Sequence, residues 1–324
     1  MSSLLSNATF LNEADQLSRA LVVLRTAYIT VTSLTIICLN SMTIAVMLRI
    51  RGEFPPGSTK VAMTSLAISD LGVGIMCVFC IPLSALDRWP FEVMWPCTVM
   101  CSVIVLLGGI SVFNLLTLSI DRLVAISKPL LYPTLLPQKR TLFFTIFGWV
   151  NSTVLVVLVM AAVQPIVEYN HDAVMCEMKY SKASLYMDVI FFCVIFMFAV
   201  VVMIGIYLKL IHISHVQAKK INMLSNAGPR REPGNPGAVG SGKAVKLLLV
   251  IVVTYTISWL PFCSVRIYGD RNPDGVPGWL EFVSVWLAIN NSWCNFVVYI
   301  GMNKTFRSMC LETLRELIKH CRRN

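Results

Sequence analysis

One carboxylate, Asp70, lies in the apolar stretch Val61–Leu86, which holds no other charged residue. Neutral polar side chains in two further apolar stretches are its candidate partners: Ser111, Asn291, Ser292 and Asn295. A carboxylate among such groups can coordinate a sodium ion, accept hydrogen bonds through water, or hold a proton. The alternative is a structural polar cluster that only joins helices. Because a charge inside an apolar span is costly, the pattern favours a functional cluster.

An acid and a base, Asp121 and Arg122, follow directly after the apolar stretch Val93–Ile120. Adjacent opposite charges can form an ion pair, and the guanidinium can exchange that partner for another, as a switch requires. Arginine is always charged, and its planar fork can also bind the backbone carbonyls of a docking helix. The alternative is an ordinary ion pair at a membrane interface, and the dipeptide alone is weak evidence.

Catalytic and metal chemistry find little support in the pattern. The single Cys-x-x-Cys motif, Cys77 to Cys80, lies in an apolar stretch without a second pair or a nearby histidine, which argues against a zinc site. The four histidines all lie outside the apolar stretches: His171, His212, His215 and His320. We therefore predict no enzyme activity.

The elements that must position these residues follow from the composition. Of the 324 residues, 56% are apolar and only 14% are charged, whereas a soluble chain has about 25% charged residues. Mean hydropathy is +0.72. A helix needs about 20 mostly apolar residues to cross a bilayer, and seven stretches meet this length. They are Thr26–Leu48, Val61–Leu86, Val93–Ile120, Thr141–Val167, Val189–Leu208, Leu247–Val265 and Phe282–Asn303. The chain is predicted to be an all-α membrane protein.

The orientation follows from the basic residues, which concentrate on the cytoplasmic side of a membrane protein. If the N-terminus is outside, only seven of the 27 basic residues fall on the outer side. The net charge of +10 then faces anionic lipid and an intracellular partner, so it does not indicate nucleic-acid binding. Cys97 and Cys176 both fall on the outer side, where a disulfide between them is favoured over two free thiols. We expect a multi-pass plasma-membrane protein with an extracellular N-terminus.

Three domains follow, with boundaries at residues 20 and 302. Residues 1–20 are the predicted extracellular N-terminus, where Asn7 lies in a glycosylation sequon. Residues 21–302 form the bundle, with a flexible inner loop at about 218–242 that is rich in Gly and Pro. Residues 303–324 form an amphipathic helix on the inner leaflet and a short tail. In this tail, Cys310 or Cys321 could carry a palmitoyl group, and unmodified thiols are the alternative.

Taken in order, these residues resemble the rhodopsin-like (class A) G-protein-coupled receptors from about Leu21 to Arg307. The matching segments are Asn40, Leu66 to Asp70, Trp89 to Phe91, Cys97 with Cys176, Asp121 to Leu123, Trp149, Ser258 to Pro261, and Asn295 to Tyr299. The resemblance implies a seven-helix bundle with an eighth helix, and a receptor that converts small-molecule binding into G-protein activation. Its implied partners are a heterotrimeric G protein, arrestin, membrane lipid and an unidentified small molecule.

The resemblance also implies how such a receptor switches. Helix six hinges at Pro261, two residues after Trp259, and its inner end moves outward. Arg122 then leaves Asp121. The remaining implied switch residues are Tyr207 and Tyr299, which hold the released arginine through water, and Leu130, which contacts the G protein.

The implied ligand pocket lies between the outer halves of helices three, five, six and seven. Its predicted lining is Cys101, Ile104, Val105, Gly108, Asp188, Phe191, Phe192, Ile195, Trp259, Phe262, Cys263, Arg266, Glu281, Trp286 and Ile289. The sequence is closest in style to the biogenic-amine branch, but Ile104 stands where amine receptors hold an aspartate. Asp188 or Glu281 could supply a counter-ion higher up, and Arg266 could meet a ligand carboxylate or pair with Glu281.

Other departures bear on cofactor and signalling. Ile289 stands where opsins hold the lysine that binds retinal, so no cofactor is expected beyond a sodium ion at Asp70. Phe296 replaces a proline of helix seven, Ala199 one of helix five, and Ser241 stands where many members hold an acid that locks the helix-three arginine. The main alternative is therefore a receptor-like protein that is constitutively active, or that has lost signalling and acts through partner association.

Overall fold

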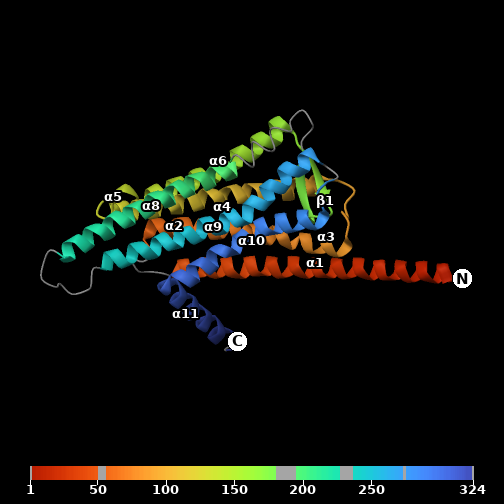
Figure 1. Ribbon diagram of the computed structural model, residues 1–324, viewed down its shortest axis with the longest axis horizontal. Helices are drawn as coiled ribbons and strands as arrows, with labels where there is room; N and C mark the ends of the chain where they lie inside the picture. The colour runs from red at the N-terminus through yellow and green to blue at the C-terminus, as the bar shows by residue number, and fades with distance from the viewer. Residues whose placement is uncertain (1, 50–55, 180–194, 227–235, 273–274, 323–324) are drawn as a thin grey trace.

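The computed structural model describes residues 2–49, 56–179, 195–226, 236–272 and 275–322, and its long helices run side by side (Figure 1). In chain order the elements are α1 (Ser2–Arg49), α2 (Gly57–Val78), α3 (Cys80–Leu86), α4 (Trp95–Ser127), α5 (Tyr132–Leu135), α6 (Gln138–Leu158), a π-helical turn (Val159–Val163), β1 (Ile166–Asn170), β2 (Met175–Lys179), α8 (Ile195–Asn226), α9 (Pro236–Arg271), α10 (Gly278–Met302) and α11 (Lys304–Cys321).

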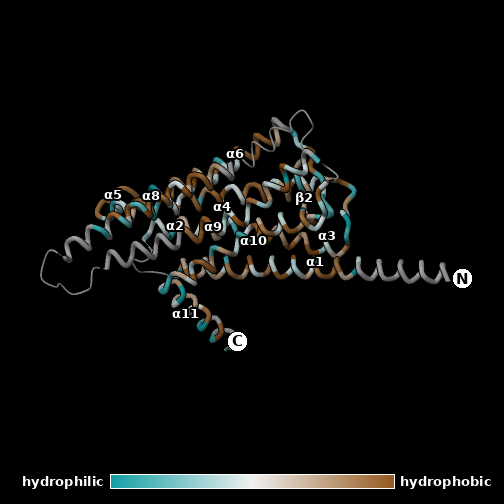
Figure 2. The backbone as a smooth tube through the Cα atoms, in the orientation of Figure 1, coloured by the Kyte–Doolittle hydropathy of each residue, from teal (hydrophilic) through white to brown (hydrophobic). Residues whose placement is uncertain are grey.

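The long helices form because their sequences are apolar around most of the helix surface, which suits lipid outside and packing inside. Figure 2 shows apolar residues along most of their length and more polar ones in the hairpin and in α11. Within the described residues, five helices are long and apolar enough to cross a membrane, including Ser18–Arg49 and Trp95–Ser127. Large apolar side chains such as Phe143 and Val157 of α6 are exposed on the outside of the bundle, as contact with lipid requires.

Two of the predicted spans are not continuous α-helices over their full length. The stretch Val61–Leu86 is divided at Phe79 into α2 and α3, because Pro82 has no N–H to donate back to the preceding turn. The stretch Thr141–Val167 is α-helical only to Leu158, and the π-helical turn Val159–Val163 follows. The prediction that a helix continues to Val167 was wrong, because Pro165 cannot extend it and Val167 belongs to β1.

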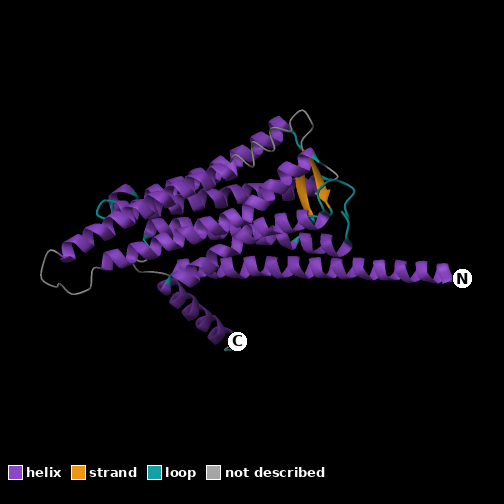
Figure 3. Ribbon diagram, in the orientation of Figure 1, coloured by secondary structure: helices purple, strands orange, loops and turns teal. Residues whose placement is uncertain are grey.

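The antiparallel hairpin of β1 and β2 closes one end of the bundle (Figure 3). Its turn is set by Asn170, whose side-chain oxygen accepts hydrogen bonds from the backbone N–H of Asp172 at 2.9 Å and of Ala173 at 3.0 Å. The disulfide between Cys97 and Cys176 ties β2 to the start of α4. The sequence indicated the covalent link but not the strands.

The other end of the bundle carries α11, which begins at an N-cap. The Oδ1 atom of Asn303 accepts a hydrogen bond from the backbone N–H of Phe306 at 3.1 Å. Phe306, Cys310 and Thr313 are buried against the bundle, and Arg49 of α1 pairs with Glu316. The predicted inner loop is shorter than expected, since α8 continues to Asn226 and α9 begins at Pro236, which leaves only 227–235 outside the described residues.

Close packing of α4 on α6 yields a stability prediction. A Cβ atom added at Gly148 would meet the Phe113 ring, whereas one added at Gly205 would meet nothing within 4 Å. Both Gly→Ala substitutions gain the same helix propensity of about 1 kcal/mol. We expect Gly148→Ala to lower the melting temperature of the purified protein, because overpacking costs about 1–3 kcal/mol. Gly205→Ala is the matched control and should leave it equal or higher. Equal melting temperatures for the two variants would contradict the packing.

Candidate functional site

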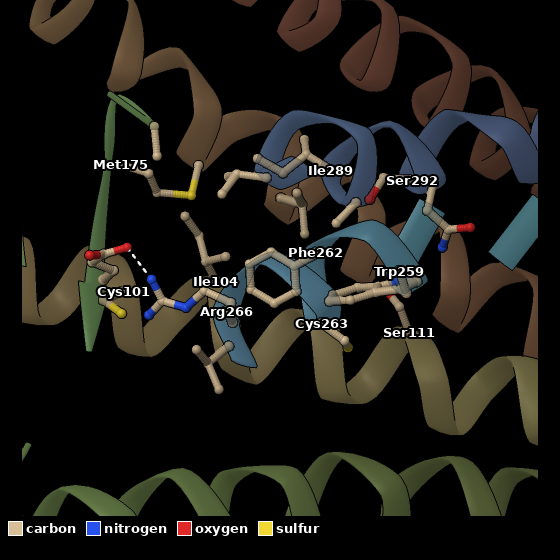
Figure 4. A pocket seen from close by; sticks show the side chains of 18 of the residues that line it. Cys101, Ile104, Ser111, Met175, Trp259, Phe262, Cys263, Arg266, Ile289 and Ser292 are labelled. Atoms are coloured by element: carbon tan, nitrogen blue, oxygen red, sulfur yellow. Dashed lines mark hydrogen bonds and ion pairs between the residues drawn. The ribbon is translucent and has the colours of Figure 1, made fainter. Parts of the chain in front are cut away.

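A cavity of about 150 Å³ lies between α2, α4, α9, α10 and the hairpin. Most of its wall is apolar, as small-molecule sites usually are. Figure 4 shows side chains from several elements pointing into it, among them Ile104, Phe262 and Ile289. The predicted pocket residues that line it are Cys101, Ile104, Val105, Gly108, Trp259, Phe262, Cys263, Arg266 and Ile289.

Two predicted pocket residues, Trp286 and Glu281, do not line this cavity, and we correct their placement. Trp286 is fully buried, and its indole Nε1 donates a hydrogen bond to the backbone oxygen of Ala173 at 2.9 Å. It lies one residue away from the face of α10 that carries Val285 and Ile289 into the cavity. Glu281 accepts a hydrogen bond from the Asn170 side chain at 2.6 Å. Both residues hold the hairpin in place.

Four other predicted pocket residues cannot be placed. Asp188, Phe191 and Phe192 lie outside the described residues, and Ile195 begins α8 without a described side chain. The sequence missed the contribution of the hairpin, whose residues 175–178 all line the cavity. A search for helical periodicity does not detect a strand. In the sequence, only the position of Cys176 could have pointed to these hairpin residues.

Arg266 and Glu177 form an ion pair at the hairpin end of the cavity. The Nη1 atom of Arg266 lies 2.5 Å from the Oε2 atom of Glu177, and its Nη2 atom donates to the backbone oxygen of Met178 at 3.2 Å. The expectation that Arg266 pairs with Glu281 was therefore wrong. Because both groups line the cavity, their opposite charges offset each other there.

The opposite end of the cavity reaches the polar cluster around Asp70. The Oγ atom of Ser111 donates to Oδ1 of Asp70 at 2.8 Å, and Nδ2 of Asn295 donates to Oδ2 at 3.1 Å. Asp70 is buried, and it lines the cavity together with Ser111, Asn291 and Ser292. Carboxylate, amide and hydroxyl oxygens are the ligands that hard cations prefer, so these side chains fit a sodium ion.

Asp121 lies near the C-terminal end of α4 in a dense hydrogen-bond network. Its carboxylate accepts from Ser58 at 2.9 Å, from Thr59 at 2.8 Å and from the Tyr132 hydroxyl at 2.8 Å. Arg122 approaches it at 3.2 Å and also donates to the Thr59 hydroxyl at 2.5 Å. Burial of the Tyr132 phenol raises its pKa, which keeps it a hydrogen-bond donor. Ser58 and Thr59 belong to α2 and Tyr132 begins α5, so no spacing along α4 pointed to them.

The remaining predicted switch residues occupy different environments. Leu130 is 93% exposed in the loop between α4 and α5. Tyr207 packs beside Leu210 of α8. Tyr299 is buried, and its hydroxyl has no hydrogen-bond partner among the described residues. Pro261 lies inside α9, where it removes one backbone hydrogen bond and allows a kink.

The predicted modification sites are only partly described. Cys310 is buried between α11 and the bundle, and burial raises the pKa of its thiol to about 11. An acyl chain on Cys310 would have to displace this packing, so the structure does not favour palmitoylation there. The side chains of Asn7 and Cys321 are not among those described.

Comparison with known proteins agrees with this architecture. The family model described as "7 transmembrane receptor (rhodopsin family)" matches residues 39–299. The histamine H2 receptor of Canis lupus familiaris is 27% identical over 266 residues, which cover 79% of this chain and 70% of that protein. The histamine H2 receptor of Homo sapiens is also 27% identical, over 77% of this chain and 68% of that protein. The probable G-protein coupled receptor 21 of Mus musculus is 27% identical over 77% of this chain and 72% of its own length.

The family match spans most of the chain and agrees with the long apolar helices. It confirms the predicted seven-helix transmembrane fold and a multi-pass protein of the plasma membrane, and it places the chain among receptors rather than enzymes. The chain belongs to the rhodopsin family of seven-transmembrane receptors.

Proposed function

We propose that this receptor converts the binding of an extracellular small molecule into activation of a heterotrimeric G protein, by outward movement of the inner end of α9. The observation that carries the proposal is that α4 joins two sites. Its outer half contributes Ile104 and Gly108 to the cavity, and its inner end carries the Asp121–Arg122 pair. A ligand that packs differently in two arrangements of α4 and α9 can therefore shift the population at the inner end.

The switch itself would be the release of Arg122. In the structure its guanidinium is held by Asp121 and Thr59, on the side of α2. Movement of α9 about Pro261 would open an inner cleft, in which Tyr207 and the unpartnered Tyr299 hydroxyl offer the arginine new partners. Leu130, exposed in the adjacent loop, would give the G protein an apolar contact.

Several further features belong to the same proposal. The N-terminus is extracellular and Asn7 is glycosylated, α11 lies on the inner leaflet, and arrestin binds the same inner face. A sodium ion at Asp70 would neutralise the carboxylate and modulate the balance between the two arrangements. Asp70 and the hydroxyls of Ser111 and Ser292 would hold it there.

A G-protein recruitment assay across the major G-protein classes tests this proposal. We expect recruitment by the full chain in cell membranes, with or without a ligand from a chemical screen. The main alternative is a protein that acts through partner association without signalling, and the substitutions Phe296 and Ala199 at motif positions favour it. Absence of recruitment in every class, with normal surface expression, would support the alternative.

A further inference from the structure

The charges along the cavity wall are unevenly distributed. Among the described residues that line it, Glu177 and Arg266 carry opposite charges and pair with each other at 2.5 Å. The third ionisable group is Asp70, whose carboxyl oxygens accept hydrogen bonds from neutral side chains, among them Ser111 and Asn295. In the part of the chain that the structure describes, Asp70 has no cationic partner. The described wall of the cavity therefore holds one carboxyl group that no described cation neutralises.

The carboxyl group of Asp70 lies deep in the cavity. Figure 4 shows Arg266 and Met175 toward one end and Ser111 and Ser292 toward the other, with Phe262 and Ile289 between them. Ser111 follows Ile104 by seven residues on α4, which corresponds to about 10 Å along a helix. A ligand that enters past the hairpin must therefore cross an apolar section before it reaches Asp70.

A second polar group lies at the cavity wall without a partner. The side chain of Tyr255 is only 1% exposed, and its hydroxyl has no hydrogen-bond partner among the described residues. Tyr255 lines the cavity and stands one turn inward from Trp259 on α9. A buried hydroxyl without a partner costs about 1–3 kcal/mol, so a ligand that supplies one gains this energy.

A charged group of a ligand cannot bind at the depth of Ile104. An ammonium group placed beside Ile104 would meet apolar neighbours, and a desolvated charge without a partner costs several kcal/mol. An anionic ligand is also disfavoured, because Arg266 already binds Glu177 and the Met178 carbonyl, and Asp70 would repel a deep anion.

We propose that the cavity takes a small organic cation whose ammonium, amidinium or guanidinium group binds Asp70 at the deep end, while its apolar body lies along Ile104, Phe262 and Ile289. The inference rests on the proposed function, since it assumes that this cavity is the ligand site. It places the charged group of the ligand about two helical turns deeper than the Ile104 level.

A series of phenylalkylammonium ions with two to about eight methylene groups tests this depth, because the apolar section is about 10 Å long. The matched phenylalkanols, which lack the charge, are the controls. Binding is measured on the purified full chain from the shift in melting temperature, without a G protein and in potassium chloride. We expect the longer ammonium ions to bind at least tenfold more tightly than the alcohols of the same length. Replacing potassium by sodium at equal ionic strength should weaken the binding of the ammonium ions.

Variants locate the charged group. Asp70→Asn should remove the preference for ammonium over alcohol. Tyr255→Phe should weaken the binding of the long ammonium ions severalfold. Ile104→Asp should move the preferred chain to a shorter length, because it supplies a carboxylate about 10 Å nearer the entrance. The melting temperature without ligand shows whether each variant folds. If Asp70→Asn does not fold, Ile104→Asp still tests the depth of the charged group.

Three results would overturn the inference. These are equal binding of ammonium ions and alcohols at every length, an ammonium preference that survives in Asp70→Asn, or tight binding of phenylalkanoates that Arg266→Gln abolishes. G-protein recruitment is measured separately. Recruitment without an ammonium preference would defeat only this inference, whereas an ammonium preference without recruitment would defeat the proposed signalling function.

Discussion

Arg122→Ala should abolish G-protein recruitment while it leaves the amount of protein at the cell surface unchanged. The proposed mechanism uses this guanidinium as the group that leaves Asp121 and enters the inner cleft, and no shorter side chain can replace it. Folding should be preserved because the Asp121 carboxylate keeps its hydrogen bonds from Ser58, Thr59 and Tyr132 after the arginine is removed. Recruitment is measured in cell membranes after nucleotide removal, which favours the receptor–G-protein complex.

Arg307→Ala provides the matched control. Arg307 is exposed on α11, so this variant also removes one positive charge from the proposed inner side of the protein. If the general basic charge of this side drives recruitment, both variants should lose recruitment to a similar extent. Recruitment retained by Arg122→Ala would refute the switch role of the arginine.

The helical framework could be predicted from the sequence because lipid imposes one requirement along each span. Nearly every residue of a stretch such as Val93–Ile120 must avoid charge, so the signal accumulates over many positions. The hairpin gave no such signal. Its pairing depends on the turn at Asn170 and on the disulfide of Cys176, which are local features of a short segment. Val167 was consequently assigned to a helix.

The candidate site was predicted where side chains repeat on one helix face and missed where distant segments meet. Ile104, Val105 and Gly108 share a face of α4, and all three line the cavity. Trp286 has the right depth on α10 but lies outside the face that points inward. The ion pair of Arg266 could not be assigned from composition, because several carboxylates lie at the outer end and only the fold brings Glu177 to it.

The resting arrangement can be tested at Asp121 itself. Asp121→Asn keeps the size of the side chain and one of its two acceptor oxygens, but it removes the charge that faces Arg122. The side chain of Asp121 is only 1% exposed, and loss of an ion pair in such a place is costly. The guanidinium would then be held mainly by Thr59. We expect G-protein recruitment without ligand to rise by about tenfold, which corresponds to a shift of about 1.4 kcal/mol in the balance of the two arrangements.

Tyr132→Phe separates the effect of charge from that of the hydrogen-bond network. It removes one donor from the same carboxylate and leaves the charge in place. A neutral hydrogen bond contributes about 1 kcal/mol and does not hold Arg122 directly, so the rise should be several times smaller than that of Asp121→Asn. Recruitment is compared at equal surface expression, and Arg122→Ala added to Asp121→Asn should return it to the level of untransfected cells. A rise in Tyr132→Phe equal to that in Asp121→Asn would mean that the hydrogen bond from Tyr132, rather than the ion pair, holds the resting arrangement.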